Sequence, residues 1–289
     1  ATPARYFDTD LVIWRTGAGE PRVFDAFCPH LGAHLGHGGK VEGETIRCPF
    51  HAWAFDGSGK CVEIPYAKRV PPKSGARAWP TLERNGMVMV WYDPAGGPPE
   101  DYVPVVEELG AEGWTPWVHR TARIKTHPRE VVENVADIAH FGPIHGNEVL
   151  DFEAKFEGPT ATQSTRTSGY DKKGRLTKQR TVATYYGPGI QFSKMDGEFD
   201  TVILNAHIPI DANHLELRMG LLVQGIDYET KLGRTLGEMW IDALHDGYFQ
   251  DVAIWEHKRW QDEPLLCDGD GPIGDLRRWY AQFYPDAVS

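Results

Sequence analysis

Two short stretches near the N-terminal end of the chain each carry one cysteine and one histidine. They are Cys28-Pro29-His30 and Cys48-Pro49-Phe50-His51. Thiolate sulfur and imidazole nitrogen are good ligands for soft or borderline transition metals. Four such ligands on two loops suit either a structural zinc ion or an iron–sulfur cluster. The sequence therefore predicts a metal centre here.

The spacing of the four ligands favours the cluster. Zinc sites more often repeat C-x-x-C, whereas here C-x-H is followed by C-x-x-H. This unequal pattern is typical of a Rieske [2Fe–2S] centre, in which two cysteines hold one iron and two histidines the other. The prolines fix the loop tips, and the glycines between the two stretches let backbone N–H groups approach the sulfides. We interpret Trp53 and Phe55 as shielding for the cluster or as ordinary core aromatics.

The remaining cysteines and nearby histidines break the ligand pattern. His34 and His37 lie between the two stretches but have no cysteine at the matching spacing, so we interpret them as exposed loop residues. Cys61 could serve only by displacing one of the four ligands. We interpret Cys61 and Cys267 as buried or inert thiols.

A second polar group occurs in the middle of the chain. Asn134, Asp137 and His140 follow one another at i, i+3 and i+6, so on a helix they share one face. His145 would point elsewhere in a regular helix, but Pro143 predicts a kink or a helix end between the two histidines. The two imidazoles then converge on one transition metal that needs a third ligand. The alternative is an amphipathic helix whose histidines are packed or exposed.

The third ligand is expected from a predicted helix of about residues 232–260. Two histidines near an electron-transfer cluster favour a two-His-one-carboxylate site with open positions for O₂ on Fe(II). Spacing alone does not separate the five acidic residues on this helix, which are Glu238, Asp242, Asp246, Asp251 and Glu256.

Composition restricts the class of protein. The chain has 289 residues, of which 41% are hydrophobic, and a net charge of −11. This length allows two ordinary domains, and the negative charge argues against nucleic acid or an anionic membrane as the main partner. Without a signal sequence or a long apolar run, a cytoplasmic location is expected by default.

The elements that must position these residues form two groups. A hairpin over residues 6–14 and 22–27 and a strand over 86–92 predict a small β domain, followed by a Pro/Gly-rich acidic linker over 94–101. Longer β segments then predict an antiparallel sheet, against which the helix of 232–260 packs with a bend at Gly247. These segments span residues 115–126, 158–168, 178–195, 200–210 and 213–226.

Taken in order, these motifs resemble the terminal oxygenase component of the Rieske non-haem iron oxygenases. Within that family the chain is similar to the subgroup of 3-ketosteroid 9α-hydroxylase oxygenases and cholesterol 7-desaturases. The likeness to the subgroup rests on residues 133–140 (ENVADIAH), 249–258 (FQDVAIWEHK) and 276–284 (LRRWYAQFY). The resemblance implies an α+β fold, with a Rieske domain over residues 1–110. A helix-grip (START-like) catalytic domain with an antiparallel sheet and a long C-terminal helix then covers residues 111–289.

The resemblance also assigns roles in the second site. It implies that His140, His145 and Asp251 bind the mononuclear iron, Asp251 being the carboxylate at the family's ligand position; the alternative is a buried acid that caps a strand or pairs with Arg259. We expect the Asp137 carboxylate to accept the second N–H of a liganding His140. By analogy, Asp137 also bridges His140 to His51 of the next subunit of a homotrimer. Asn134 stands near the iron or caps a helix.

The function implied is that of an oxygenase. A separate NAD(P)H-dependent flavin and iron–sulfur reductase, with or without a ferredoxin, would supply electrons for O₂ to attack an apolar polycyclic, steroid-like substrate. The absence of a Gly-rich dinucleotide fingerprint agrees with this need for a reductase. Candidate pocket walls, any of which can be ordinary core, are Phe141, Ile144, Val149, Phe192, Trp240 and Tyr248.

Four alternatives remain open at the level of sequence. Within the same family, the chain could be a sterol desaturase or an oxygenase or demethylase of a smaller aromatic compound. Outside enzymes, it could be a Rieske electron carrier, or a structural zinc protein if the first site holds zinc.

Overall fold

The computed structural model describes residues 1–170, 174–197 and 199–284, which divide into two compact units. The first unit is Ala1–Asp101 and the second is Tyr102–Ser289. The expected domain boundary at residue 110 lies slightly farther along the chain. Between these two positions, Glu108 pairs with Lys194 at 2.5 Å, so this segment packs with the second unit.

The first unit consists of short antiparallel strands. One four-stranded sheet has the order β1-β2-β3-β8, another the order β4-β5-β6-β7, and β9 and β10 form a hairpin. Their bounds are Thr2–Tyr6 (β1), Thr9–Arg15 (β2), Pro21–Asp25 (β3), Lys40–Glu42 (β4), Thr45–Arg47 (β5), Ala54–Asp56 (β6), Cys61–Glu63 (β7), Ala78–Trp79 (β8), Thr81–Arg84 (β9) and Met87–Val90 (β10).

The predicted strand over residues 6–14 is wrong at its start. Phe7 and Asp8 have φ values of 54° and 55° and form a tight turn, so this stretch contains the end of β1, a turn and most of β2. Neither residue is a glycine, and the pattern of apolar residues therefore gave no sign of the turn.

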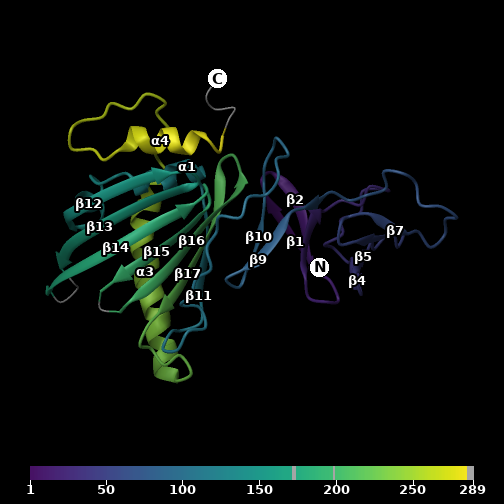
Figure 1. The fold of residues 1–289 in the computed structure, drawn as a ribbon, viewed down its shortest axis with the longest axis horizontal. Coiled ribbons are helices and arrows are strands. Elements are labelled where there is room, and N and C mark those ends of the chain that lie inside the picture. Colours follow the sequence, from purple (N-terminus) through teal and green to yellow (C-terminus); the bar gives the residue numbers. More distant parts are fainter. Residues whose placement is uncertain (171–173, 198, 285–289) are drawn as a thin grey trace. The chain divides into compact units, whose positions relative to one another are not determined.

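The second unit is built on a seven-stranded antiparallel sheet with the order β11-β17-β16-β15-β14-β13-β12 (Figure 1). Its strands are Val118–Ile124 (β11), Glu148–Glu157 (β12), Thr160–Tyr170 (β13), Leu176–Tyr186 (β14), Ile190–Asp196 (β15), Thr201–Asp211 (β16) and His214–Val223 (β17). Its helical segments are Pro128–Val132 (α1), Glu133–Val135 (η1), Phe141–His145 (α2), Lys231–Trp255 (α3) and Ile273–Ala281 (α4).

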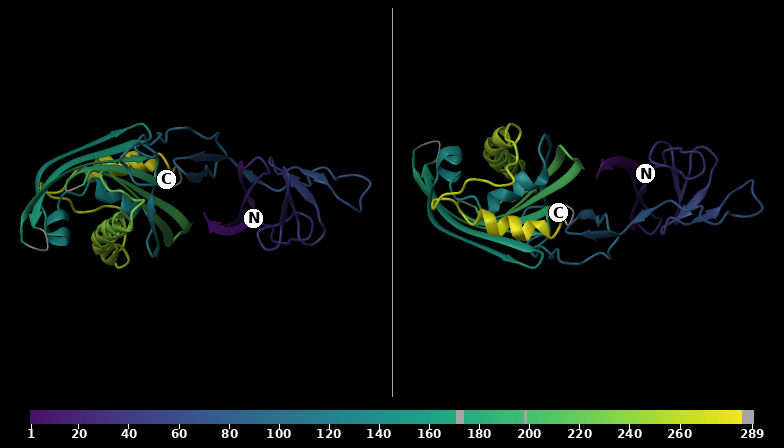
Figure 2. Two further views of the ribbon diagram at one scale, coloured as in Figure 1. Left: turned by 90° about the horizontal axis from the view of Figure 1, so that it is seen from below. Right: turned by 90° about the horizontal axis from the view of Figure 1, so that it is seen from above.

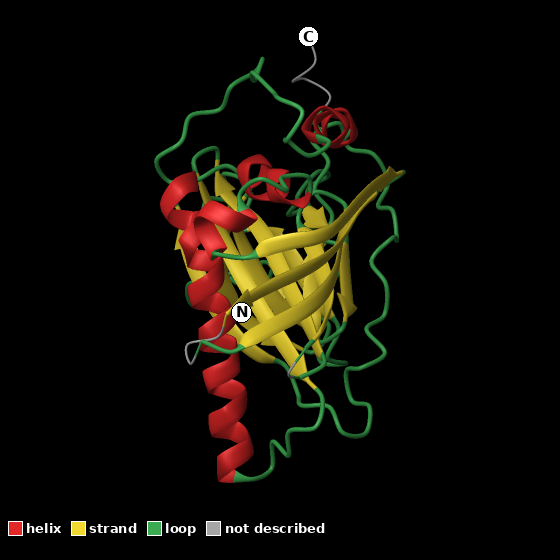
Figure 3. Cartoon of the chain, turned by 90° about the vertical axis from the view of Figure 1, so that its left-hand side faces the viewer, coloured by secondary structure: helices red, strands yellow, loops and turns green. Residues whose placement is uncertain are grey.

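One face of this sheet carries the helices, as two further views of the unit show (Figures 2 and 3). Leu217 on β17 packs with Val252 and Trp255 of α3, and Ala161 on β13 packs with Val132 of α1. Directly paired residues of neighbouring strands share a face, so the inward face can be followed from strand to strand. No helix within the described ranges is long and apolar enough to cross a membrane.

Three predicted elements differ from the structure. The segment 178–195 is two strands, β14 and β15, joined by a turn at Gly187 (φ 69°), and β12 was not predicted. The helix predicted over residues 232–260 is α3, which runs unbroken through Gly247 and ends at Trp255, five residues earlier than predicted. The polar segment from Asn134 to His145 is not one helix either, since η1 and α2 are separated by non-helical residues 136–140.

Candidate metal centres

The two Cys/His stretches lie on two loops of the first unit, one between β3 and β4 and the other between β5 and β6. Cys28 follows β3, and its carbonyl accepts from the N–H of Gly32 at 2.9 Å, which closes a tight turn. Cys48 follows β5, and its carbonyl accepts from Ala52 at 3.1 Å, with Ala52 at a φ of 57°. Backbone hydrogen bonds within each loop therefore help to fix its shape.

The four side chains lie together. Cys28 and Cys48 are buried, and burial raises the pKa of the Cys28 thiol to about 11. The rings of His30 and His51 have centroids 4.6 Å apart. Among the described residues, the buried Nδ1 atoms of both rings have no hydrogen-bond partner.

These properties fit a metal cluster. Buried polar atoms without partners are costly, and ligation through Nδ1 would satisfy both rings. A metal also removes the proton from a thiol that otherwise stays protonated in this environment. Cys28, His30, Cys48 and His51 are therefore a donor set suited to a [2Fe–2S] cluster.

Aromatic side chains surround this donor set. Trp53 stacks on His30 at 4.6 Å and an interplanar angle of 11°, and its Nε1 donates to the Tyr66 hydroxyl at 2.8 Å. Phe55 is fully buried in the core of the unit. Trp53 is therefore placed to shield the site, whereas Phe55 is a core residue.

The other thiols and imidazoles of this region lie outside the donor set. His37 is exposed, and the partly buried His34 accepts from the Gly36 N–H through Nδ1 at 3.0 Å. Cys61 is buried and Cys267 is exposed.

His140, His145 and Asp251 converge in the second unit. Their candidate ligand atoms all lie within 4.8 Å of one another, and they are the single such group of three or more His, Cys, Asp or Glu residues found within the described residues. The two rings have centroids 5.2 Å apart, and His145 Nε2 lies 3.3 Å from an Asp251 carboxylate oxygen. This hydrogen bond raises the pKa of His145.

The local backbone explains how the two histidines meet. The Asp137 carboxylate accepts from the N–H groups of Ala139 and His140 at 3.0 and 3.2 Å, which shapes the turn before α2. His140 is the N-cap of α2 and His145 its last residue. The bend therefore precedes His140, and the predicted bend at Pro143 is wrong, because a proline in the first turn of a helix breaks no helical hydrogen bond.

The Nδ1 atom of each ring has a hydrogen-bonding partner. His140 Nδ1 lies 2.9 Å from the Asp137 main-chain oxygen, and His145 Nδ1 lies 2.9 Å from Gln250 Oε1. Such bonds fix the tautomer that leaves Nε2 free for a metal. The expectation for Asp137 differs in detail, because its carboxylate is 3.6 Å from the ring and the carbonyl is the closer partner. Gln250 was missed, although it directly precedes Asp251.

The other acidic residues of the helix have different partners. Glu238 and Asp242 bind Arg120 at 2.6 and 2.8 Å. Glu256 accepts from the Lys125 N–H at 3.0 Å, and Asp246 is exposed. Of these five acidic residues, Asp251 is the one whose side chain is buried. Its ion-pair partner is His145, not Arg259.

A pocket of about 370 Å³ lies beside this group. His140 and Asp251 contribute to its wall, as do both Asn134 and Asp137. The other lining residues are Ala139, Pro143, Ile144, Ile254, Trp255, Lys258 and Asp270.

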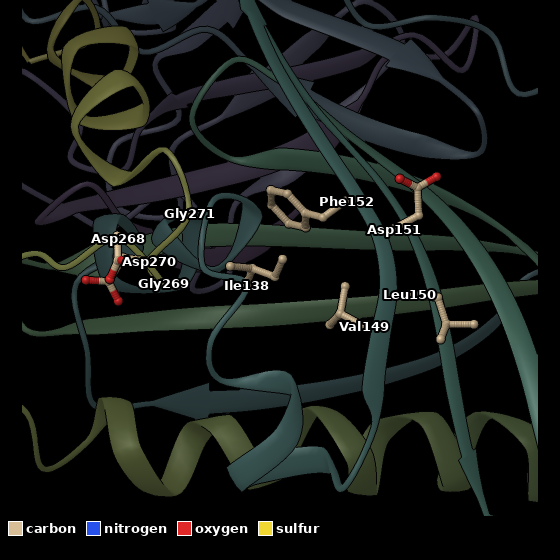
Figure 4. A pocket seen from close by; sticks show the side chains of 9 residues that line it. All are labelled: Ile138, Val149, Leu150, Asp151, Phe152, Asp268, Gly269, Asp270 and Gly271. Atoms are coloured by element: carbon tan, nitrogen blue, oxygen red, sulfur yellow. The ribbon is translucent and has the colours of Figure 1, made fainter.

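A second pocket of about 390 Å³ lies between β12 and the segment 268–271 (Figure 4). Ile138, Val149 and Phe152 give it an apolar wall, and Asp268 and Asp270 stand at its other side. It contains no His or Cys, so nothing in its lining provides a second soft-metal site.

The inward face of the sheet carries polar side chains that sequence reasoning missed. Gln163 follows the inward-facing Ala161 by two residues on β13, so it also faces inward. Asn205 of β16 is paired with Gln191 of β15, which is paired with the inward-facing Tyr185 of β14, so Asn205 faces inward too. In the part of the chain that is described, the buried Gln163 Nε2 and Asn205 Oδ1 have no hydrogen-bond partner. Alternation of polar and apolar residues in a strand does not reveal which face is enclosed, so no signal in the sequence marked them.

The predicted pocket walls divide into three groups. Ile144 and Val149 line the two pockets, and Phe141 lies against His140. Tyr248 and Trp240 pack on the inward core, where Trp240 donates to Thr201. Phe192 is wrong as a wall of an inward pocket, because it follows the inward Gln191 and so lies on the other face of the sheet.

Two family profiles match the chain. Residues 90–284 match the family described as "3-Ketosteroid 9alpha-hydroxylase C-terminal domain". Residues 1–74 match the family described as "Rieske [2Fe-2S] domain".

Curated relatives cover nearly the whole chain. The chain is 41% identical to a 3-ketosteroid-9-alpha-monooxygenase, oxygenase component, of Rhodococcus rhodochrous, over 97% of the chain and 76% of the relative. It is 32% identical to cholesterol 7-desaturase of Xenopus laevis, over 95% of the chain and 66% of that relative.

Among solved structures, the fold is similar to dicamba monooxygenase bound to 3,6-dichlorosalicylic acid. The TM-score is 0.78, and the match covers 99% of this chain and 93% of the other at 17% identity. At this identity the likeness shows the fold alone.

Proposed function

Because the chain belongs to the Rieske oxygenase α subunits related to 3-ketosteroid 9α-hydroxylases, we propose that it is the terminal oxygenase of a multicomponent monooxygenase that hydroxylates a steroid-like polycyclic substrate. Electrons would come from a separate NAD(P)H-dependent flavin and iron–sulfur reductase, directly or through a ferredoxin. The observation that carries the proposal is the convergence of His140, His145 and Asp251 in a chain that also has a Rieske [2Fe–2S] domain.

We assign the cluster to residues 1–110 and the mononuclear iron to residues 111–289. Cys28, His30, Cys48 and His51 would hold the cluster, and His140, His145 and Asp251 the iron. The bound metals would supply single electrons and the reduction of O₂ at open coordination positions.

The remaining site residues orient the ligands or connect the centres. The Asp137 carbonyl and Gln250 hold the two imidazoles with Nε2 inward. The Asp137 carboxylate, in the wall of the pocket beside His140, would face His51 of the next subunit in a homotrimer. Asn134 lines the same pocket and would act near the iron without being a principal ligand.

The substrate class agrees with the inward face of the sheet. Gln163 Nε2 is a donor suited to a ketone oxygen, and Asn205 Oδ1 is an acceptor suited to a hydroxyl group. A largely apolar polycycle with a ketone at one end and a hydroxyl group at the other carries one hydrogen-bonding partner for each of these two atoms.

The test is turnover with a reductase, NAD(P)H and O₂ against a panel of 3-ketosteroids, sterols and small aromatic acids. We expect a hydroxylated 3-ketosteroid by mass spectrometry. Turnover of a small aromatic acid with no product from any polycycle would contradict the substrate assignment.

Sterol desaturation is a second candidate, favoured by the relative from Xenopus laevis. It needs the same electrons and O₂ but gives a new double bond instead of a hydroxyl group. In the same panel, a product lighter than its substrate by two hydrogens would identify this outcome.

A further inference from the structure

A buried histidine outside the metal-ligand set lies on the inward face of the sheet. His207 on β16 is 1% exposed, and burial lowers its pKa to about 3, so the ring is neutral at working pH. Two tyrosines flank it, Tyr248 of α3 and Tyr185 of β14.

The two contacts of His207 are unequal. Its Nε2 lies 2.9 Å from the Tyr248 hydroxyl, whereas its Nδ1 lies 3.5 Å from that of Tyr185. We assign the shorter bond as Tyr248 donating to Nε2, which leaves the Nδ1 hydrogen directed at the Tyr185 oxygen. A polar ring inside a core stabilises a fold less than an apolar side chain of the same size, so this group calls for a role beyond packing.

Tyr248 connects this histidine with the candidate iron site. It lies three residues before Asp251, one turn along α3. Its ring is 5.3 Å from that of Trp255, and Trp255 lines the pocket together with His140 and Asp251. Oxidisable aromatic rings thus lead from the pocket wall to His207.

We propose that Tyr248 and His207 form a proton-coupled redox pair that consumes the oxidant left when O₂ is reduced without a substrate in place. The inference rests on the proposed oxygenase function and adds a protective role to the same site.

The step balances in one electron and one proton. The Tyr248 ring gives one electron to the O₂-derived oxidant, and the O–H bond breaks as its proton crosses to Nε2 of His207, where an N–H bond forms. The products are a neutral phenoxyl radical and an imidazolium, which the Tyr185 oxygen helps to stabilise at Nδ1. One electron from the reductase then returns the radical to a phenolate, and the proton moves back from His207.

The experiment follows the radical instead of turnover alone. The holoenzyme is mixed with reductase, NAD(P)H and O₂ without substrate, frozen during turnover and examined by EPR, with ring-deuterated tyrosine to identify a tyrosyl radical. Tyr248→Phe removes only the hydroxyl group, and His207→Gln keeps a hydrogen-bond acceptor but not a base. Tyr186→Phe is the matched control, since Tyr186 adjoins Tyr185 on the other face of β14.

We expect a tyrosyl radical in the wild type and in Tyr186→Phe, and its loss in Tyr248→Phe and His207→Gln. These two variants should also inactivate after several-fold fewer uncoupled turnovers than the wild type and Tyr186→Phe. The loss in His207→Gln separates proton transfer from mere positioning, and it also covers the case in which Tyr248→Phe fails to fold.

Two results would contradict the proposal that Tyr248 and His207 form a redox pair. One is a radical unchanged in Tyr248→Phe or His207→Gln. The other is a wild-type enzyme that hydroxylates a steroid but forms no tyrosyl radical, which leaves the proposed function intact. Absence of O₂ consumption and product with every substrate would overturn the proposed function as well.

Discussion

Asp137 acts through both its side-chain carboxylate and its main-chain carbonyl. Its carboxylate holds the turn that precedes α2, and its carbonyl orients the His140 ring. The proposed electron transfer between subunits would give the negative charge of this carboxylate a further role.

Asparagine at this position separates the capping of the turn from the negative charge. Asp137→Asn keeps an oxygen that caps the turn but removes the charge, whereas Asp137→Ala removes both. If the charge carries the electron path, both variants lose roughly 10- to 100-fold in coupled turnover while keeping cluster and iron. Recovery of activity in Asp137→Asn alone would show that the turn is the whole role.

The unpartnered amide of Gln163 predicts a contact with a substrate oxygen. Gln163→Leu should raise KM for a ketosteroid by about 2- to 10-fold, the value of one neutral hydrogen bond, with kcat little changed. A steroid that lacks the contacted oxygen is the control, because wild type and variant should then have equal KM. An equal rise in KM for both steroids would instead indicate lost packing.

At the scale of elements, ion pairs and a stacked tryptophan join α1, η1, the end of α3 and α4. Arg277 of α4 binds Glu133 at 2.8 Å and lies 3.9 Å over the Trp260 ring. Arg129 of α1 lies over Trp260 at 4.2 Å. Lys258 binds Glu130 at 2.8 Å. These contacts hold the segment before His140 against the end of the helix that carries Asp251.

Removing one member of this network should destabilise the second unit. Arg277→Ala leaves the largely buried Glu133 with only the longer Lys258 contact, and we expect a loss of about 2 kcal/mol in unfolding free energy. Arg278→Ala, at the next and exposed position of α4, should cost little. Equal denaturation midpoints for the two variants would contradict this account of the network.

Sequence reasoning predicted elements with long periodic patterns and failed where single residues decided the backbone. The antiparallel sheet, the long helix and the α+β class are confirmed, because each rests on many residues of one period. The break before His140 depends on one carboxylate that caps a turn, and the turn at Phe7 on two residues with positive φ. The Cys/His pairs were visible in sequence because they are local, whereas Asp251 required the family resemblance.

At the scale of the whole molecule, the proposed electron path runs between subunits. A head-to-tail ring is the simplest closed arrangement that places one subunit's cluster beside the next subunit's iron. In the proposed assignment each compact unit would hold one centre, so a substitution can remove either centre without changing the other unit.

Mixed assemblies test this arrangement. Asp251→Ala chains lack the iron site, and Cys48→Ser chains lack the cluster, so each should be inactive alone. Co-expressed with different tags and purified as mixed trimers, they should regain a substantial part of wild-type turnover. Mixed trimers that form but stay inactive would show that electrons pass within one subunit.

The proposed function requires that one chain hold two separate iron centres. Iron and acid-labile sulfide measured on the purified wild type should show one iron more than the two of the [2Fe–2S] cluster. In Asp251→Ala that extra iron should be lost while sulfide and the visible spectrum of the cluster remain, and Asp246→Asn, an exposed acid of the same helix, should match the wild type. A wild type without the extra iron, or an Asp251→Ala variant that retains it, would contradict the assignment of His140, His145 and Asp251.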